Sequence, residues 1–131
     1  MKTLIYLIAI ITVFTGCEKI GKYCITISNN SEYPISVYGT YIQPDTSISS
    51  TPPQRFITIN SNSDSQCLFD SDVNDERFER LKSEKLTIFV FNTDTLEKYD
   101  WETIQKEYKI LKRYELNHED LMKINNVVTY P

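Results

Sequence analysis

Alternation of apolar and polar side chains is the feature that most restricts the fold of this chain. Residues 23–28 place Tyr23, Ile25 and Ile27 at one parity and smaller or polar side chains at the other. Residues 35–42 alternate in the same way. Successive side chains of a strand point to opposite faces, so this period of two predicts strands with one buried face.

Further segments carry strand signals. Residues 86–92 are apolar at both parities, which predicts a central strand covered on both faces. Turn-forming residues at 29–34 and 61–64 predict two antiparallel hairpins, one joining the first two strands and one joining the next two. About seven strands are expected in all, at 23–28, 35–42, 55–60, 65–69, 86–92, 108–116 and 127–130.

Helical signals are short and lie between these strands. Asp100 can cap residues 101–108, where Trp101, Ile104 and Tyr108 share one stripe. Asn117 and Asp120 have the spacing of a capping box. We therefore expect three short helices, at 74–82, 101–108 and 117–124.

These elements predict a mainly β protein. The expected architecture is an antiparallel β-sandwich, immunoglobulin-like or transthyretin-like, with short helical insertions. If residues 108–116 continue the helix that begins at Asp100, the strand count falls and an α+β roll is the alternative. Residues 43–54 contain three of the five prolines and form the longest expected loop.

The N-terminus has the three parts of a secretory signal. Lys2 precedes an uncharged apolar run at 4–14, and two small residues lead into Cys17. The run is shorter than the roughly 20 apolar residues that a bilayer-spanning helix needs. We predict a signal peptide at 1–16, a tether at 17–22 and a single domain at 23–131.

Residues 14–17, Phe-Thr-Gly-Cys, resemble the lipobox of bacterial lipoproteins, although the usual first residue of that motif is Leu. The resemblance implies that Cys17 is lipidated and becomes the new N-terminus. The alternative is an ordinary buried or bridged cysteine. The whole chain, rich in Asn, Asp, Lys and Tyr, is similar to small lipoproteins of Bacteroidetes-type bacteria. That likeness implies a palmitate-type anchor in the outer membrane, on either its periplasmic or its surface side.

Cys24 and Cys67 are the remaining cysteines. In an exported protein they can form a disulfide, with only one connectivity available. Both lie in apolar-rich strand segments, where a free buried cysteine is equally suited. The sequence leaves these two alternatives open.

Aromatic side chains offer a candidate binding surface. The chain has nine tyrosines and one tryptophan. Tyr38, Tyr41 and Trp101 are candidates for a platform that stacks on sugar rings. Core filling is the competing explanation for these rings.

Catalytic and metal-binding signals are weak. His118, the only histidine, begins a predicted helix without a recognisable nucleophile beside it in sequence. Residues 70–75 begin like a calcium loop, but Asp75 and Leu81 replace the glycine and the bidentate Glu that such a loop needs. We predict no catalytic residue, metal or cofactor.

The function expected from these signals is a lipid-anchored envelope protein that acts as a non-catalytic binding or accessory module for a protein or glycan. An envelope hydrolase using His118 with carboxylates is one alternative. A structural component that pairs through an edge strand such as 127–130 is another. The net charge is −4 and the basic residues are scattered, so nucleic acid is not an expected partner.

Overall fold

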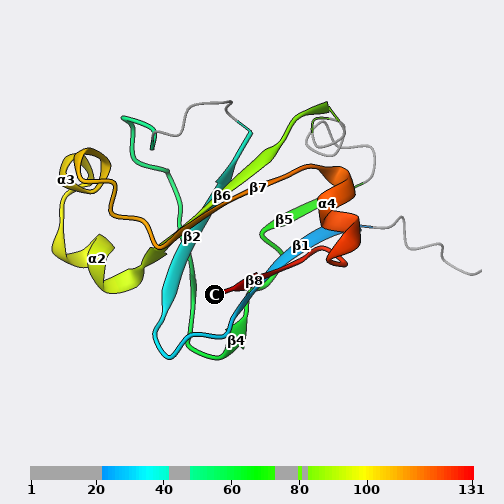
Figure 1. The fold of residues 1–131 in the computed structure, drawn as a ribbon, viewed down its shortest axis with the longest axis horizontal. Coiled ribbons are helices and arrows are strands. Elements are labelled where there is room, and N and C mark those ends of the chain that lie inside the picture. Colours follow the sequence, from blue (N-terminus) through cyan, green and yellow to red (C-terminus); the bar gives the residue numbers. More distant parts are fainter. Residues whose placement is uncertain (1–21, 42–47, 73–79, 81–82) are drawn as a thin grey trace, which may run out of the picture.

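Two four-stranded sheets face each other in the computed structural model, which describes residues 22–41, 48–72, 80 and 83–131. The first sheet contains β1 (Lys22–Asn29), β4 (Ser63–Asp64), β5 (Phe69–Asp72) and β8 (Val127–Tyr130). The second has the order β3 (Ile57–Ile59), β2 (Ile35–Thr40), β6 (Leu86–Asn92) and β7 (Lys112–Leu116). Three short helices complete the described part: α2 (Thr93–Lys98), α3 (Trp101–Lys106) and α4 (His118–Lys123) (Figure 1). The prediction of a mainly β, sandwich-like fold is confirmed.

β1 is the central strand of the first sheet. β4 and β5 follow one another along the same side of β1, because the Ser65 N–H donates to the Ile27 carbonyl and the Leu68 N–H to the Ile25 carbonyl. Residues 63–72 therefore act as one antiparallel strand interrupted by a bulge at 65–68. β8 runs along the other side of β1 and is parallel to it, unlike every other strand pair described here.

Both predicted hairpins are wrong in their pairing. β1 and β2 lie in different sheets, and β3 pairs with β2 instead of with the strand that follows it. The alternation of the sequence shows which face of a strand is buried, but two strands of the same pattern can sit beside each other or across the core. Here residues 30–34 carry the chain from the first sheet to the second, so the consecutive strands β1 and β2 face each other across the core.

The buried Asn29 side chain holds this crossing. Its amide nitrogen donates to the carbonyls of Tyr33, Ile59 and Asn60, at 2.9, 3.2 and 3.0 Å. Its carbonyl oxygen accepts from the backbone N–H and the hydroxyl of Ser31. A buried amide that is fully hydrogen-bonded can fix a loop in one conformation. The turn at Asn29 therefore joins the two sheets.

The predicted helices and the ambiguous segment 108–116 have different outcomes. α3 and α4 are confirmed, with Asp100 capping α3 and a capping box between Asn117 and Asp120. β7 occupies the end of residues 108–116, so the segment does not continue the helix and the α+β roll is not observed. The sequence prediction missed α2, which Asn92 caps. The predicted helix at 74–82 falls outside the described residues, apart from Arg80.

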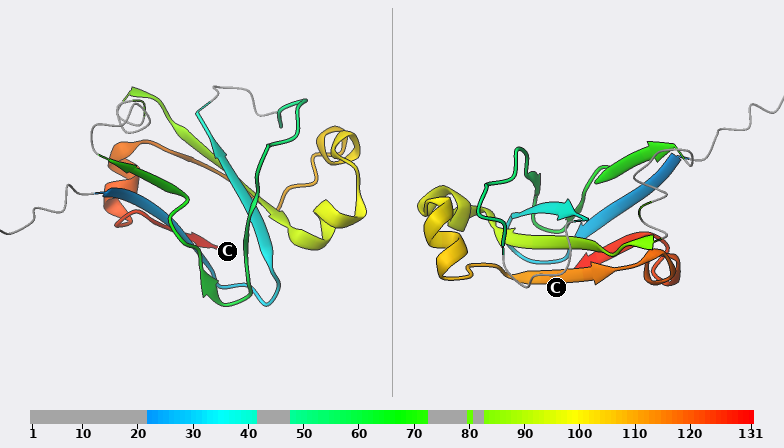
Figure 2. Two further views of the ribbon diagram at one scale, coloured as in Figure 1. Left: turned by 180° about the vertical axis from the view of Figure 1, so that it is seen from behind. Right: turned by 90° about the horizontal axis from the view of Figure 1, so that it is seen from above.

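Two apolar cores lie on opposite faces of the second sheet. The strand at 86–92 is buried on both faces, as predicted. Ile88 and Val90 face the core between the sheets, whereas Phe89 and Phe91 face a second core covered by α3 and by residues 48–56. Figure 2 shows α2 and α3 at one end of the molecule, and α4 with the start of β1 at the other. No helix in the described part of the chain is long and apolar enough to cross a membrane.

Candidate functional site

The three predicted stacking aromatics do not form one platform. Tyr38 of β2 belongs to the second core, whereas Tyr41, just beyond the end of that strand, belongs to the core between the sheets. Tyr38 and Trp101 do meet, with ring centroids 6.4 Å apart. Tyr38 is only 9% exposed, and Phe89 and Phe91 stack on its ring with centroid distances of 5.0 and 5.9 Å. The faces of these rings are therefore occupied by each other, and the core-filling explanation describes them better.

The backbone of Ile48 and Ser49 forms a wall beside this aromatic cluster. The Trp101 indole N–H donates to the Ser49 carbonyl at 2.9 Å, and the Gln105 side-chain amide donates to the Ile48 carbonyl at 3.1 Å. Ile48 is itself buried in the second core, which we call the outer core because it lies on the face of the second sheet that points away from the first sheet. α3 thus fixes the segment that starts at Ile48 against the second sheet.

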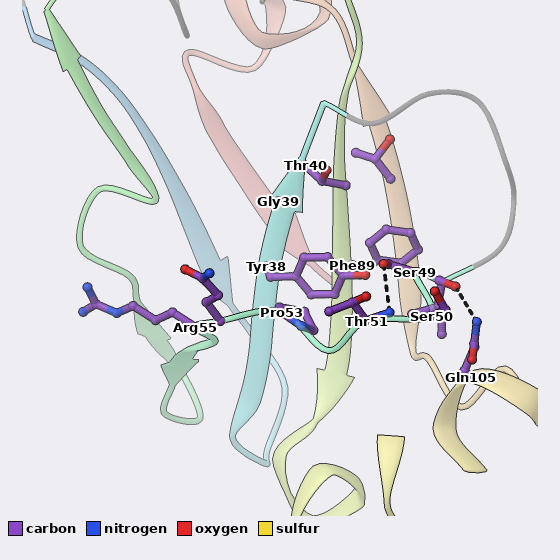
Figure 3. A pocket seen from close by; sticks show the side chains of 13 residues that line it. Tyr38, Gly39, Thr40, Ser49, Ser50, Thr51, Pro53, Arg55, Phe89 and Gln105 are labelled. Carbon is purple, nitrogen blue, oxygen red and sulfur yellow. Dashed lines mark hydrogen bonds between the residues drawn. The ribbon is translucent and has the colours of Figure 1, made fainter. Parts of the chain in front are cut away.

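A pocket of about 640 Å³ lies between this wall and the outer face of β2 and β6. We call it the Tyr38 pocket (Figure 3). Among the described residues that line it, Arg55 carries the only charge, and in Figure 3 its side chain points away from the Tyr38 ring. Uncharged hydrogen-bonding side chains dominate the rest of the lining: Thr40, Ser49, Ser50, Thr51, Gln54, Thr87 and Gln105. This lining suits a neutral polar ligand group.

The Tyr38 hydroxyl is the unusual group of this pocket. It is buried and has no hydrogen-bond partner among the described residues. Burial raises the pKa of Tyr38 to about 12, with a smaller electrostatic contribution from Tyr108. The hydroxyl therefore stays protonated at neutral pH and can donate one hydrogen bond and accept another. A buried hydroxyl without a partner costs about 1–3 kcal/mol.

A second hollow, of about 600 Å³, lies between β3 and residues 63–68. We call it the edge hollow. It shares Tyr38, Gly39 and Arg55 with the Tyr38 pocket, so the two adjoin at β2. Its walls come from different sheets, with Ile57 and Thr58 on one side and Asp64 and Leu68 on the other.

A disulfide fixes one wall of the edge hollow. Cys24 of β1 is bonded to Cys67 of the bulge, with their Cα atoms 5.2 Å apart. Of the two alternatives that the sequence left open, the structure has the bridge. It ties the bulge at 65–68 to the central strand of the first sheet.

His118 lies away from both hollows. It begins α4, and neither hollow includes it among its lining residues. The neighbouring carboxylate of Asp120 accepts the Asn117 backbone N–H at 3.0 Å, so it serves the helix cap. Within the described ranges, no group of three or more side chains is placed to hold a metal ion. Cys17 and most of the calcium-like segment at 70–81 lie outside the described residues or have undescribed side chains.

The residues that build the Tyr38 pocket were only partly visible in the sequence. The loop expected at 43–54 does contribute its described end, from Ile48 onward. Gln105 and Thr87 carried no signal, because a polar residue on a predicted helix or strand does not show which loop it will contact. No protein-family model, curated protein or solved structure matches this chain. The geometry of the site is therefore the basis for assigning a function.

Proposed function

We propose that this chain is a lipid-anchored protein of the cell envelope whose domain is a non-catalytic binding module for a protein or glycan partner. The anchor would be acyl chains on Cys17, in the outer membrane. Support for the anchor is the apolar run followed by Gly16 and Cys17 in the sequence. Support for binding comes from the Tyr38 pocket.

The observation that carries the binding proposal is that Tyr38 lines an open pocket while its own hydroxyl is buried and has no hydrogen-bond partner among the described residues. The pocket rests on a sheet face and is held on its other side by α3, so it is formed before a ligand arrives. The lining offers hydroxyl and amide groups, which suit a sugar ring or an uncharged polar side chain. The Tyr38 hydroxyl acts here as a hydrogen-bonding group, since its raised pKa makes it a poor source of phenolate.

Fluorescence of Trp101 provides the test. Trp101 is the only tryptophan, and its indole binds the Ser49 carbonyl in the pocket wall. The full-length protein, purified in detergent, is titrated with N-acetylglucosamine as a glycan fragment and with N-acetylasparagine amide as a protein fragment. We expect a saturable change in fluorescence with at least one probe. Replacing Tyr38 with Phe should weaken that binding by about 3- to 10-fold, the value of one hydrogen bond.

Tyr108→Phe is the matched control, because Tyr108 is exposed and lies outside the pocket lining. It should bind the probe as the wild type does. The binding proposal would be contradicted if neither probe gave a saturable response, or if Tyr38→Phe bound as tightly as Tyr108→Phe.

A further inference from the structure

The two sides of the sandwich are closed to different extents. On the side of β7 and β8, the Tyr114 hydroxyl donates to the Thr129 carbonyl at 2.9 Å and so bridges the two sheets. The Val127 N–H at the start of β8 also has a partner, because it donates to the Ile124 carbonyl. On the opposite side, the edge hollow separates β3 from residues 63–68. An accessible strand edge therefore lies at β3, whereas β8, the edge expected from the sequence, is partly protected.

The strand register shows which backbone groups face the edge hollow. The Pro34 carbonyl accepts the Thr93 N–H. The backbone N–H and C=O groups of even-numbered residues of β2 therefore point toward β6, and those of odd-numbered residues point toward β3. Ile57 and Ile59 are the partners of Val37 and Ile35, and Thr58 must then point away from β2. The Asn60 carbonyl points the same way, and the Asn29 amide reaches it across the gap between the sheets.

Thr58 and Phe56 are left with unpaired backbone groups at this edge. No hydrogen bond to the backbone N–H or C=O of either residue occurs within the described ranges. An unpaired edge of this kind is a template for another extended chain. A sugar would need a free aromatic face to stack on, but in the neighbouring cluster the face of Tyr38 is covered by Phe89 and Phe91.

We propose that the edge hollow binds an extended peptide of a partner protein, which adds to β3 as a further strand. Its backbone would pair with Thr58 and Phe56, as in other recognition by strand addition. Alternate side chains would point inward, where Ile57, Ile59 and Leu68 favour apolar groups. Because both hollows share Tyr38 and Gly39, the same peptide continues to the Tyr38 pocket. The inference rests on the proposed binding function and assigns its partner to proteins.

The test uses a matched pair of substitutions at Thr58. A phage-displayed library of random peptides is selected on the full-length protein in detergent, and the selected peptides are then measured against variants. Thr58→Pro removes the outward N–H, and proline is tolerated at an edge strand where that group faces solvent. Thr58→Val keeps the N–H and loses the hydroxyl, which contacts Ser36 at 3.2 Å in the wild type. We expect peptide binding to fall about tenfold or more in Thr58→Pro and to stay within about threefold in Thr58→Val.

Amide hydrogen exchange of the wild type is a second readout that does not depend on how the proline variant folds. Peptide binding should slow exchange at Thr58 and leave exposed amides of α2 unchanged. The inference fails if no peptide is selected, if peptides bind both variants equally, or if Thr58 exchange is unaffected. If the peptide test fails but the sugar or amide probe still gives a response that depends on Tyr38, strand addition is wrong and the proposed binding function stands. Selected peptides that need Thr58 but not Tyr38 would support strand addition and count against the Tyr38 pocket.

Discussion

Tyr38 combines a structural cost with a proposed function in one residue. Its ring fills the outer core, while its hydroxyl lacks a partner. At neutral pH, Tyr38→Phe should therefore leave the free energy of unfolding unchanged or raise it by up to about 1 kcal/mol, since it removes a buried, unpaired hydroxyl. A gain in stability with a loss in binding is the pattern expected of a residue retained for its ligand.

The pH dependence of stability provides the measurement for this residue. The pKa of Tyr38 and the pKa of Tyr130 are both raised to about 12, mainly by burial. An unfolded tyrosine has a pKa near 10, so the unfolded state loses these protons first as the pH rises. Stability should be fully present below about pH 10 and should fall between about pH 10 and 12. Denaturant unfolding across this range should show a shallower fall in Tyr38→Phe than in wild type. Equal slopes would show that Tyr38 is not shielded from solvent.

At the scale of elements, the crossing at Asn29 decides the topology. Five hydrogen bonds converge on this side chain, from the loop that follows it and from the end of β3. Asn29→Ala should lower the free energy of unfolding by about 2–4 kcal/mol, because it leaves several buried carbonyls without donors. Urea unfolding measures this change. Asn30→Ala, at an exposed neighbour, should stay within about 0.5 kcal/mol of wild type. Similar losses in the two variants would show that Asn29 does not hold the crossing.

The same crossing shows how far the sequence could predict the fold. Alternation placed β1 and β2 correctly, and the run of apolar residues at both parities placed β6, because burial of one or both faces determines the local pattern. It could not show that β1 and β2 oppose each other, since the buried amide of Asn29 looks like an ordinary turn residue in sequence. The parallel pairing of β8 with β1 depends on a contact between the two ends of the domain, which no local signal reports.

The candidate site was predictable to a similar degree. Tyr38 and Trp101 were identified by residue type, but the stacking of Phe89 and Phe91 on Tyr38, which makes it a core residue, depends on the tertiary structure. The polar lining of the Tyr38 pocket comes from segments far apart in the chain, from Thr40 to Gln105. The edge hollow depends on missing backbone pairing, which is a property of the assembled sheets. Side-chain patterns do not contain that information.

The place where the chain enters the domain limits how the domain can lie relative to a membrane anchor at Cys17. β1 begins at Lys22, at the end of the long axis opposite α2 and α3 (Figure 1). Only residues 18–21 separate Cys17 from this strand, and five residue steps can span at most about 18 Å. If Cys17 carries the proposed acyl chains, the β1 end is kept near the bilayer. α3, which holds one wall of the Tyr38 pocket, lies at the opposite end of the domain and can extend away from the membrane toward a partner.

Cys17→Ser tests this arrangement in cells. Each buried methylene of an acyl chain contributes about 0.8 kcal/mol, so more than one chain gives stable membrane attachment. We expect the wild type to incorporate labelled palmitate and to sediment with membranes, and Cys17→Ser to lose the label and leave the membrane fraction. The double variant Cys24→Ser with Cys67→Ser is the control, because it removes the other two cysteines and their disulfide. It should keep both the label and the membrane location. Label on Cys17→Ser, or its absence from the double variant, would assign the lipid to a different cysteine and remove the basis for this orientation.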